Sequence, residues 1–542
     1  MSKNPDEKFS ATTFTRESTG LVKAASPWQA ALWNVANVMG SKFPWSVARL
    51  GIFPVALILG TSPYLWAMLL VGLASYVLAI IYVQITSAIP RSGADYVTPS
   101  RLLGPFWGWL VSWMLVCSFI PVWGYVTWVT LRNIKQLIDI LRIGGMTTLD
   151  VPWILKGTPA FVFGIIVILS AAGMCFLPAK RYYKLVGAIV GAALASLVVT
   201  ALATAMISPS VFDANLQRLV GLSSASVIQT ALKNGYEPNG KLDLAGTAEL
   251  VGLALFGISG FQFSATISAE LKGDNKRSLS ISILGSLTLF IVCFVGIVWL
   301  MLTKFNYDLV VGWSYLFWNG LPGAPFKLPP INALLLTIGF PELAPIWAIV
   351  GVSVLVGGWM IVPASMIYIN RLVISWGMDR MVPSALFEVN PRLGQPLKLV
   401  IVEAILAMFF FALTLLNLNP ITYLWWGALL LFPSYLFPAL CALSLPRKRP
   451  DLMQYVPWRN WLKPLAILWI IIIVPVYAFA VLIGSFPALP TETAMWRYAL
   501  SSGLIITAAV IMIGILTFIV VRVINVRRGI DVDLIFKEIP PE

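Results

Sequence analysis

The chain has 542 residues, of which 59% are hydrophobic and only 11% are charged, and its mean hydropathy is +0.86. This composition excludes a soluble globular domain and predicts an all-α polytopic membrane protein. Lysine and arginine outnumber the acidic residues by 37 to 23, and the net charge of +14 fits loops facing anionic lipid better than nucleic-acid binding.

Twelve apolar segments are long enough to cross a bilayer, and they predict 12 transmembrane helices. Their number is even, so both termini are expected on the same side. The inner loops then collect most of the lysines and arginines, which predicts cytoplasmic N- and C-termini. The segments run approximately as Trp28–Leu59, Tyr64–Ile89, Pro105–Leu131, Pro159–Leu177, Tyr183–Ile207, Gly246–Leu271, Leu279–Thr303, Leu343–Asn370, Leu399–Asn417, Ile421–Leu445, Leu465–Gly484 and Tyr498–Val521.

Segments one and six are interrupted. The run Met39-Gly40-Ser41-Lys42-Phe43-Pro44 lies inside segment one, where Pro44 removes a backbone donor. Segment six contains Phe256-Gly257-Ile258-Ser259-Gly260-Phe261, whose two glycines each weaken a helix by roughly 1 kcal/mol relative to alanine. In lipid, freed backbone groups are tolerated where they line a cavity or meet a ligand, so both breaks predict a binding site. A small-residue packing face between helices is the alternative interpretation.

The two breaks lie five spans apart, with two further spans after the tenth. Two units of five spans inserted with opposite topology would bring both breaks together at the midplane of the membrane. This symmetry is inferred from the positions of the breaks, because the two halves show no obvious residue-level repeat.

The sequence has no histidine, which excludes histidine ligands, histidine general bases and histidine proton relays. Its four cysteines lie in apolar runs without C-x-x-C spacing, so we expect small buried side chains and no metal site or cofactor. Residues 1–26 are polar and mixed in charge, and no signal peptide is expected there. The spans offer no reactive cluster, which argues against a membrane enzyme.

Three stretches of the sequence carry motifs that occur in the same order in a known protein family. The first runs from Ile89-Pro90-Arg91-Ser92-Gly93-Ala94-Asp95-Tyr96 to Leu103-Gly104-Pro105-Phe106-Trp107-Gly108-Trp109, the second is Phe256–Phe261 with Ala269-Glu270-Leu271-Lys272, and the third is Asn370–Pro383 with Val389–Pro396. Together they resemble the amino acid–polyamine–organocation (APC) transporter superfamily, in its loop between spans two and three, its sixth span and its loop after span eight. Ala94 stands where that family has a second glycine.

The resemblance implies a five-plus-five inverted-repeat fold with broken helices 1 and 6 and two extra helices. It implies a secondary transporter, a symporter or antiporter, that moves an amino acid or related amine across the plasma membrane by alternating access. We expect a cytoplasmic segment at 1–27, a ten-helix transport core at 28–445, helices 11 and 12 at 446–523 and a cytoplasmic tail at 524–542. A sensor that binds an amino acid without moving it is the alternative, and the oligomeric state stays open.

By the same resemblance, the substrate carboxylate meets backbone amides near Gly40 and Ser41, and its ammonium group meets carbonyls near Phe256, Gly257 and Ile258. An alternative register places Asn37-Val38-Met39 at the binding triplet of span one. The pocket residues are apolar or small, which favours neutral amino acids. The expected substrate-binding residues are Met39, Gly40, Ser41, Phe256, Gly257, Ile258, Ser259 and Gly260.

Two charged residues are candidates for coupling and gating. An ionisable group near the bilayer centre costs at least roughly 2.5–3.5 kcal/mol and is usually functional, so Lys42 is a candidate for taking up a coupling proton or replacing a coupling cation. The alternative is that Lys42 lies nearer an interface and extends its ammonium group to water. Glu270, at the inner end of span six, is a candidate for an inner-gate ion pair. The alternative is an ordinary interfacial carboxylate, and the same two interpretations apply to Asp95 and Asp379. Span eight offers only Ser353 and Ser365 as hydroxyl ligands, which favours proton coupling or exchange over sodium coupling.

Overall fold

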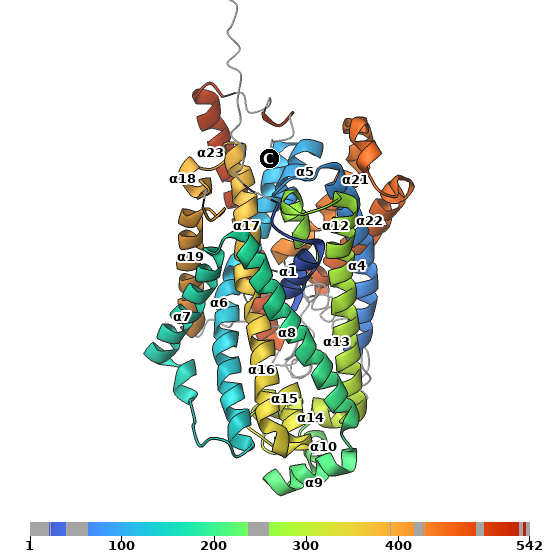
Figure 1. Ribbon diagram of the computed structural model, residues 1–542, viewed down its shortest axis with the longest axis vertical. Helices are drawn as coiled ribbons and strands as arrows, with labels where there is room; N and C mark the ends of the chain where they lie inside the picture. The colour runs from blue at the N-terminus through green and yellow to red at the C-terminus, as the bar shows by residue number, and fades with distance from the viewer. Residues whose placement is uncertain are drawn as a thin grey trace, which may run out of the picture.

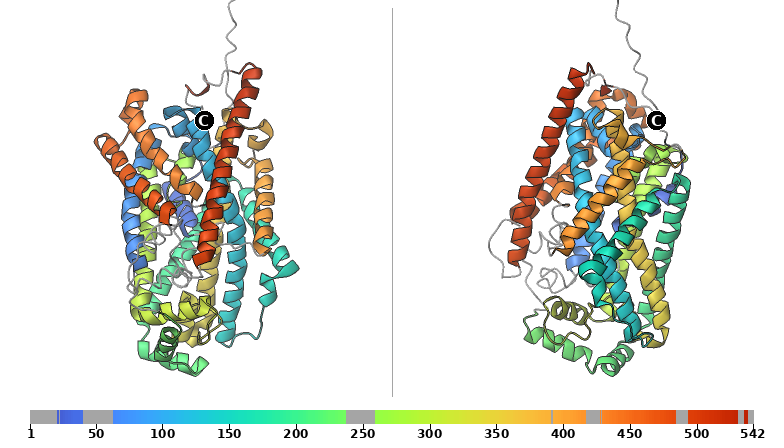
Figure 2. Two further views of the ribbon diagram at one scale, coloured as in Figure 1. Left: turned by 180° about the vertical axis from the view of Figure 1, so that it is seen from behind. Right: turned by 90° about the vertical axis from the view of Figure 1, so that its left-hand side faces the viewer.

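The computed structural model describes residues 21, 23–39, 63–236, 259–390, 392–416, 427, 429–483, 493–530 and 535–537. Within these ranges the regular secondary structure is helical, and extended pairing is limited to isolated bridges between Ala25 and Leu271 and between Asn390 and Gln395. The long helices stand side by side in one elongated bundle (Figures 1 and 2).

Ten helices in the described part of the chain are long and apolar enough to cross a membrane. They coincide in order with ten of the predicted segments, namely two to five and seven to twelve. Segment one is described only as α1 (Pro27–Met39), and segment six only from Ser259 onwards. A polytopic all-α membrane fold is therefore confirmed, whereas the count of 12 and the inverted repeat stay predictions.

In chain order, the spanning helices are α4 (Pro63–Ala88), α6 (Pro105–Ile143), α7 (Gly157–Cys175), α8 (Ala179–Met206), α12 and α13 (Asn275–Leu279 and Gly285–Lys304), α16 and α17 (Ala344–Trp359 and Ile361–Met378), α19 (Leu397–Leu415), α21 (Leu436–Lys448), α22 (Leu462–Ile483) and α23 (Thr493–Arg527). Shorter α-helices are α5 (Ala94–Leu102), α9 (Pro209–Val220), α10 (Ser224–Lys233), α14 (Tyr307–Trp318), α15 (Asn332–Gly339) and α18 (Ser384–Phe387). The 3₁₀ turns are η1 (Pro152–Leu155), η2 (Phe263–Glu270), η4 (Pro341–Leu343), η5 (Pro450–Tyr455) and η6 (Arg459–Trp461), and η3 (Ser280–Leu284) is a π-helix.

The third and eighth spans show the largest extensions beyond their predicted C-terminal ends. α6 continues past Leu131 to Ile143, because Asp139 accepts hydrogen bonds from Lys135 (2.6 Å) and Arg142 (3.2 Å) on successive turns. Span eight continues to Met378, so the stretch from Asn370 to Gly377, expected in a loop, is helical. The polar side chains of this stretch find partners inside the protein, as the Ser375 hydroxyl does by donating to Ser92 O at 2.8 Å.

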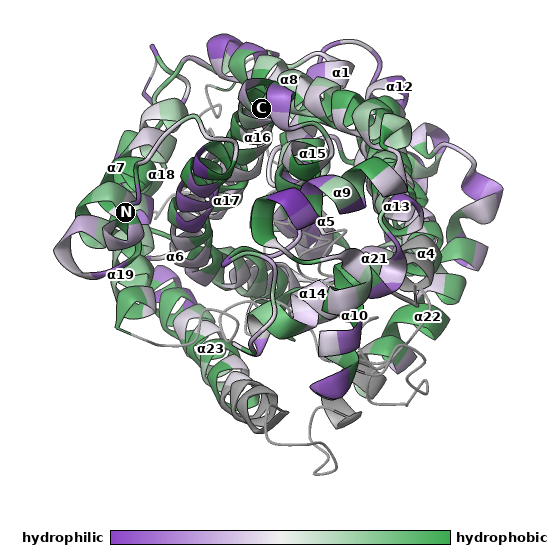
Figure 3. Ribbon diagram, turned by 90° about the horizontal axis from the view of Figure 1, so that it is seen from below, coloured by the Kyte–Doolittle hydropathy of each residue, from purple (hydrophilic) through white to green (hydrophobic). Residues whose placement is uncertain are grey.

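The outer surface of the bundle is apolar and its interior is partly polar. Side chains such as Ile166 on α7, Leu202 on α8, Ile405 on α19 and Ile519 on α23 are more than half exposed. Figure 3 shows hydrophobic residues around the outside of the ring of helices and hydrophilic residues towards its centre, where α5 lies. A surface of this kind is stable in lipid rather than in water, which fits the predicted spans.

The two ends of the bundle differ. α5, α12 and α18 lie at the upper end in Figure 1, and α9, α10, α14 and α15 form a helical cap at the lower end. The polar contacts described below connect the upper end to the centre of the bundle.

Candidate functional site

α1 packs directly against the chain that follows the predicted break in segment six. The Asn34 side chain on α1 lies within hydrogen-bond distance of Ser264 Oγ (2.9 Å), and Ser264 N donates to Asn34 Oδ1 (2.8 Å). Asn34 Nδ2 also reaches Ser282 O at 2.9 Å, inside the π-helix η3. A π turn disturbs the regular i→i−4 pairing, and such turns are frequent at functional sites. One buried amide thus joins spans one, six and seven.

Gly260 lies directly against α1. It has φ +109°, and a Cβ on this residue would lie only 2.8 Å from the Cβ of Asn37. Asn37 is buried, and its Oδ1 has no hydrogen-bond partner among the described residues. A free acceptor therefore lies beside the predicted break, on a residue of the alternative binding register.

The described end of segment six departs from an α-helix. Residues 259–262 form turns, η2 is a 3₁₀ helix, and Ile267 within it has φ −109° and ψ 21°. Its backbone groups bond to neighbouring elements, as Thr266 O does by accepting from Gly93 N at 2.9 Å. Contacts to α1 and α5 replace the helical hydrogen bonds over this stretch, which follows the break predicted in segment six.

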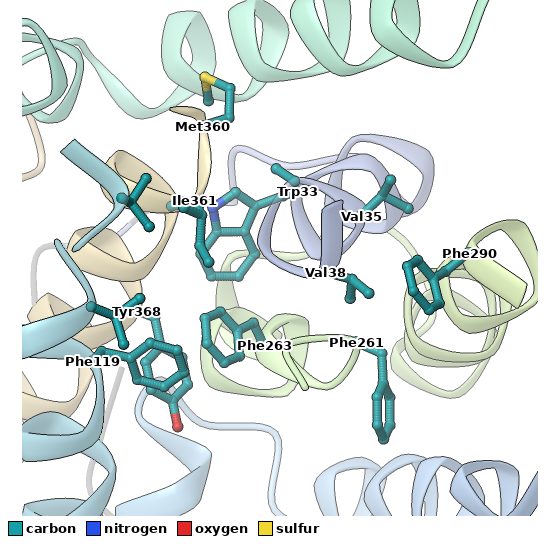
Figure 4. Packing of buried hydrophobic residues seen from close by; sticks show 14 of the residues in the cluster. Trp33, Val35, Val38, Phe119, Phe261, Phe263, Phe290, Met360, Ile361 and Tyr368 are labelled. Carbon is teal, nitrogen blue, oxygen red and sulfur yellow. The ribbon is translucent and has the colours of Figure 1, made fainter. Parts of the chain in front are cut away.

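An aromatic layer fills the space between α1, α6, α17 and η2. The ring centroids of Phe263 and Tyr368 are 4.0 Å apart and the rings are stacked, while Phe119 and Trp33 lie 5.1 Å and 6.1 Å from Phe263. Figure 4 shows these four side chains turned towards one interior space. All four side chains are 7% exposed or less, so the rings pack together in the interior of the bundle.

Above this layer, Asp95 of α5 joins three further elements. Its carboxylate accepts hydrogen bonds from Tyr82 of α4 (2.8 Å), Tyr368 of α17 (2.8 Å) and Thr266 of η2 (3.2 Å). Burial raises the pKa of Asp95 above the ordinary aspartate value, although the three hydroxyl donors act to lower it. The interpretation of Asp95 as an ordinary interfacial carboxylate is therefore wrong, since the side chain is 5% exposed.

Glu270 and Arg371 form a buried ion pair. Arg371 Nη2 donates to Glu270 Oε2 at 3.1 Å, and Arg371 Nη1 donates to Gln395 Oε1 at 2.9 Å. The exposed fractions of the two charged side chains are 0% and 1%. The pair links η2 to α17, which is the ion pair expected of Glu270, with Arg371 as the partner.

A second buried ion pair lies nearby, between Arg101 of α5 and Asp379 after α17. Arg101 Nη2 donates to Asp379 Oδ1 at 2.8 Å, and both side chains are 1% exposed. The interpretation of Asp379 as an interfacial carboxylate is likewise wrong. The ring of Phe536, near the C-terminus, lies 5.0 Å from the Arg101 guanidinium carbon and covers this pair.

Most predicted binding residues lie outside the described residues, and so does the coupling candidate Lys42. These binding residues are Gly40, Ser41, Phe256, Gly257 and Ile258. Met39 is the last residue of α1, and its side chain is not described. Ser259 and Gly260 are described, and both are buried next to α1.

Several interior polar residues were not predicted as part of the site from the sequence. Asn34 and Glu403 stand inside apolar segments one and nine, and a polar side chain within a predicted span was the signal that would have singled them out. No such signal in the sequence indicated that Asp95 and Asp379 would each be buried and bonded to other residues, because both lie near span ends, where charged residues are common. Among the described residues, no group of three or more Cys, Asp or Glu side chains is arranged to hold a metal ion.

The apolar surface and the buried polar interior define an integral membrane protein whose central contacts join segments one and six, in which the sequence predicts breaks. The sequence pattern of the amino acid permease family matches residues 28–516, so the chain belongs to this family. This confirms the resemblance and places the protein among transporters rather than enzymes. The branched-chain amino acid permease BcaP of Lactococcus lactis subsp. cremoris (strain MG1363) is 22% identical over 329 residues. That match covers 60% of this chain and 63% of the relative, which is less than two thirds of its length.

Proposed function

We propose that the protein is a secondary active transporter that carries a neutral amino acid across the plasma membrane by alternating access. The observation that supports this most is the direct packing of α1 on residues 259–264 through Asn34, Asn37 and Gly260. The two interrupted segments of the predicted inverted repeat therefore meet, as a shared binding site requires.

The substrate carboxylate binds the backbone amides near Gly40 and Ser41, where the positive end of a half-helix attracts an anion. Its ammonium group binds carbonyls near Phe256, Gly257 and Ile258, with Ser259 and Gly260 completing the site. The apolar residues around the break favour an uncharged side chain. The name of the relative, a branched-chain amino acid permease, supports the same class of substrate.

Alternating access requires the closed end to open. The aromatic layer, the Asp95 contacts and the two buried ion pairs lie between the proposed site and the upper end of the bundle. Opening therefore separates Glu270 from Arg371, and we assign this pair as a gate. The upper end carries the clusters Lys272-Lys276-Arg277 and Arg447-Lys448-Arg449, which supports a cytoplasmic location for it and for both termini.

Coupling to protons, or exchange of one substrate for another, is the energy source we propose. The Ser365 hydroxyl donates to Ile361 O at 2.6 Å and accepts from Trp123 Nε1 at 2.8 Å, so it is already engaged within the protein. This leaves span eight with a poor supply of hydroxyl ligands for sodium. Lys42 stays a candidate for the group that responds to the proton.

A thermal-stability screen tests the choice of substrate. Purified protein is heated with each of the common amino acids, and a ligand of the folded state raises the melting temperature in proportion to its concentration. Neutral branched-chain amino acids are expected to give the largest increase. Stabilisation by arginine or glutamate alone would contradict the proposal. Stabilisation by leucine without flux in proteoliposomes would favour a sensor.

A further inference from the structure

Glu403 is a buried acidic side chain within a membrane span. It lies near the end of the second turn of α19, it is 2% exposed, and neither carboxyl oxygen has a hydrogen-bond partner among the described residues. The other buried carboxylates described above, on Asp95, Glu270 and Asp379, are each bonded to arginine or to hydroxyl donors. Glu403 differs from them in having neither.

The position of Glu403 follows from the packing of α19 on its neighbours. Gly124 of α6 lies against the backbone of Phe410 and Phe411 of α19, so close that a Cβ there would be 2.5 Å from Phe410 C. The two helices run in the same direction. Cys117 lies seven residues before Gly124 on α6, and Glu403 lies seven residues before Phe410 on α19. Seven residues are roughly two helical turns. Cys117 is therefore level with Glu403. On α7, the Cys175 thiol lies within electrostatic range of Glu403 and also of Arg371.

The groups around Glu403 leave its charge without compensation. The thiols of Cys117 and Cys175 are neutral partners at most, and the Cys175 Sγ already lies 3.7 Å from Pro363 O of α17. The charged groups on the elements packed against α19 already form ion pairs with other residues, namely Arg371 with Glu270, Asp379 with Arg101, and Lys398 with Glu388. The remaining titratable groups of α6 lie one or more turns further along that helix. They are Tyr125, Arg132, Lys135, Asp139 and Arg142.

A carboxylate ion in this place would have lost its hydration without gaining a cation or a donor. Such a group is stable only when it is protonated and neutral. In the arrangement described here, with the end above the aromatic layer closed, Glu403 therefore holds a proton. It can release that proton only in an arrangement that brings water to it.

We propose that Glu403, rather than Lys42, binds the coupling proton of transport. This inference rests on the proposed function in its proton-coupled form. One proton is taken up from water by the Glu403 carboxylate, is carried as the O–H of the neutral acid, and returns to water on the other side. Release is tied to opening, because the Cys175 thiol lies within electrostatic range of both Glu403 and Arg371 of the gate, so water that enters between the parted gate residues comes near α19.

The test compares wild type, Glu403→Gln and Glu388→Gln in proteoliposomes with labelled L-leucine. Glutamine has nearly the shape of the protonated acid and cannot release a proton, so Glu403→Gln should keep leucine counterflow while leucine accumulation driven by a pH gradient falls by about tenfold. Glu388→Gln is the matched control, since Glu388 is 70% exposed and pairs only with Lys398. It should behave as wild type in both assays.

Each result decides between the two proposals. Undiminished pH-driven accumulation in Glu403→Gln overturns the assignment of Glu403. Leucine counterflow in wild type without any response to a pH gradient overturns it as well, while amino acid transport stands. No leucine movement in wild type contradicts the proposed function itself.

Infrared difference spectroscopy gives a readout independent of transport. The carbonyl band of a protonated carboxylic acid should be present in purified wild type and lost in Glu403→Gln, while the melting temperature stays the same. If the two spectra coincide in the region of that band, Glu403 is ionised and the assignment is wrong.

Discussion

Gly260 of segment six and Asn37 of segment one are in contact, and the contact leaves no room for a side chain on residue 260. A Cβ there would lie 2.8 Å from the Asn37 Cβ, and the φ of +109° is one that residues with a Cβ rarely adopt. The backbone of one segment therefore reaches the side chain of the other at the place where the substrate site is proposed.

Gly260→Ala should weaken both stability and transport. Backbone strain and overpacking each cost about 1–3 kcal/mol at such a position. Leucine uptake should fall by at least about tenfold, because a displacement near the bound substrate misplaces its ligands. The matched control is Gly191→Ala in α8, where a Cβ meets nothing within 4 Å. The control should be stabilised slightly, and equal behaviour of the two variants would contradict the importance of the contact.

Glu270→Gln should destabilise the closed arrangement. Removing one partner of a buried ion pair costs about 3–5 kcal/mol, because the other charge stays buried and unpaired. The double variant Glu270→Gln/Arg371→Gln should recover part of the lost melting temperature. Glu388→Gln, in the exposed pair with Lys398, should change stability by less than about 1 kcal/mol. A double variant no more stable than Glu270→Gln would count against a direct pair.

The Asp95 contacts predict a pH dependence of stability. Burial raises the pKa of Asp95 in the folded protein, so the folded state binds a proton more readily than the unfolded chain. This contribution is fully present below the ordinary aspartate value of about 3.9 and is lost as the pH rises through the raised folded value. Asp95→Asn should remove that part of the dependence when melting temperature is measured against pH. If the melting temperature of wild type minus that of Asp95→Asn increased with pH, the prediction would be contradicted.

Lys42 is tested by its effect on uptake rather than on stability. If its ammonium group responds to the coupling proton, Lys42→Met and Lys42→Gln should both flatten the dependence of leucine uptake on pH. If it extends to an interface, both variants should transport with the rate and pH profile of wild type, and the coupling role of Lys42 would be abandoned.

Much of the fold followed from hydropathy alone, because crossing a bilayer demands long apolar helices and little else has that pattern. Span ends were less predictable. α6 and α17 continue beyond their apolar runs because Asp139 and Arg371 find charged partners within the protein. The partners of Asp139 lie four residues before it and three residues after it and are visible in the local sequence, whereas the pairing of Arg371 with Glu270 leaves no trace there. The irregular end of segment six was placed by its glycines, but the 3₁₀ geometry of η2 depends on Asn34 and Asp95, which are remote in sequence.

The candidate site was predictable in outline and not in its partners. Gly260 was found from its spacing, and Glu270 from its place at a span end. Arg371 as the partner of Glu270, and the isolation of Glu403, depend on how α17 and α19 pack. A helix face reveals that a polar residue is present, but only the neighbouring helices decide whether it is paired.

Leucine counterflow is the most direct measurement of the central proposal. Proteoliposomes containing purified protein are loaded with unlabelled L-leucine and diluted into labelled L-leucine. We predict saturable entry of labelled L-leucine. Valine and isoleucine should reduce this entry by competition, whereas arginine and glutamate should not affect it. Entry equal to that of protein-free vesicles, for leucine and for every other neutral amino acid tried, would contradict it.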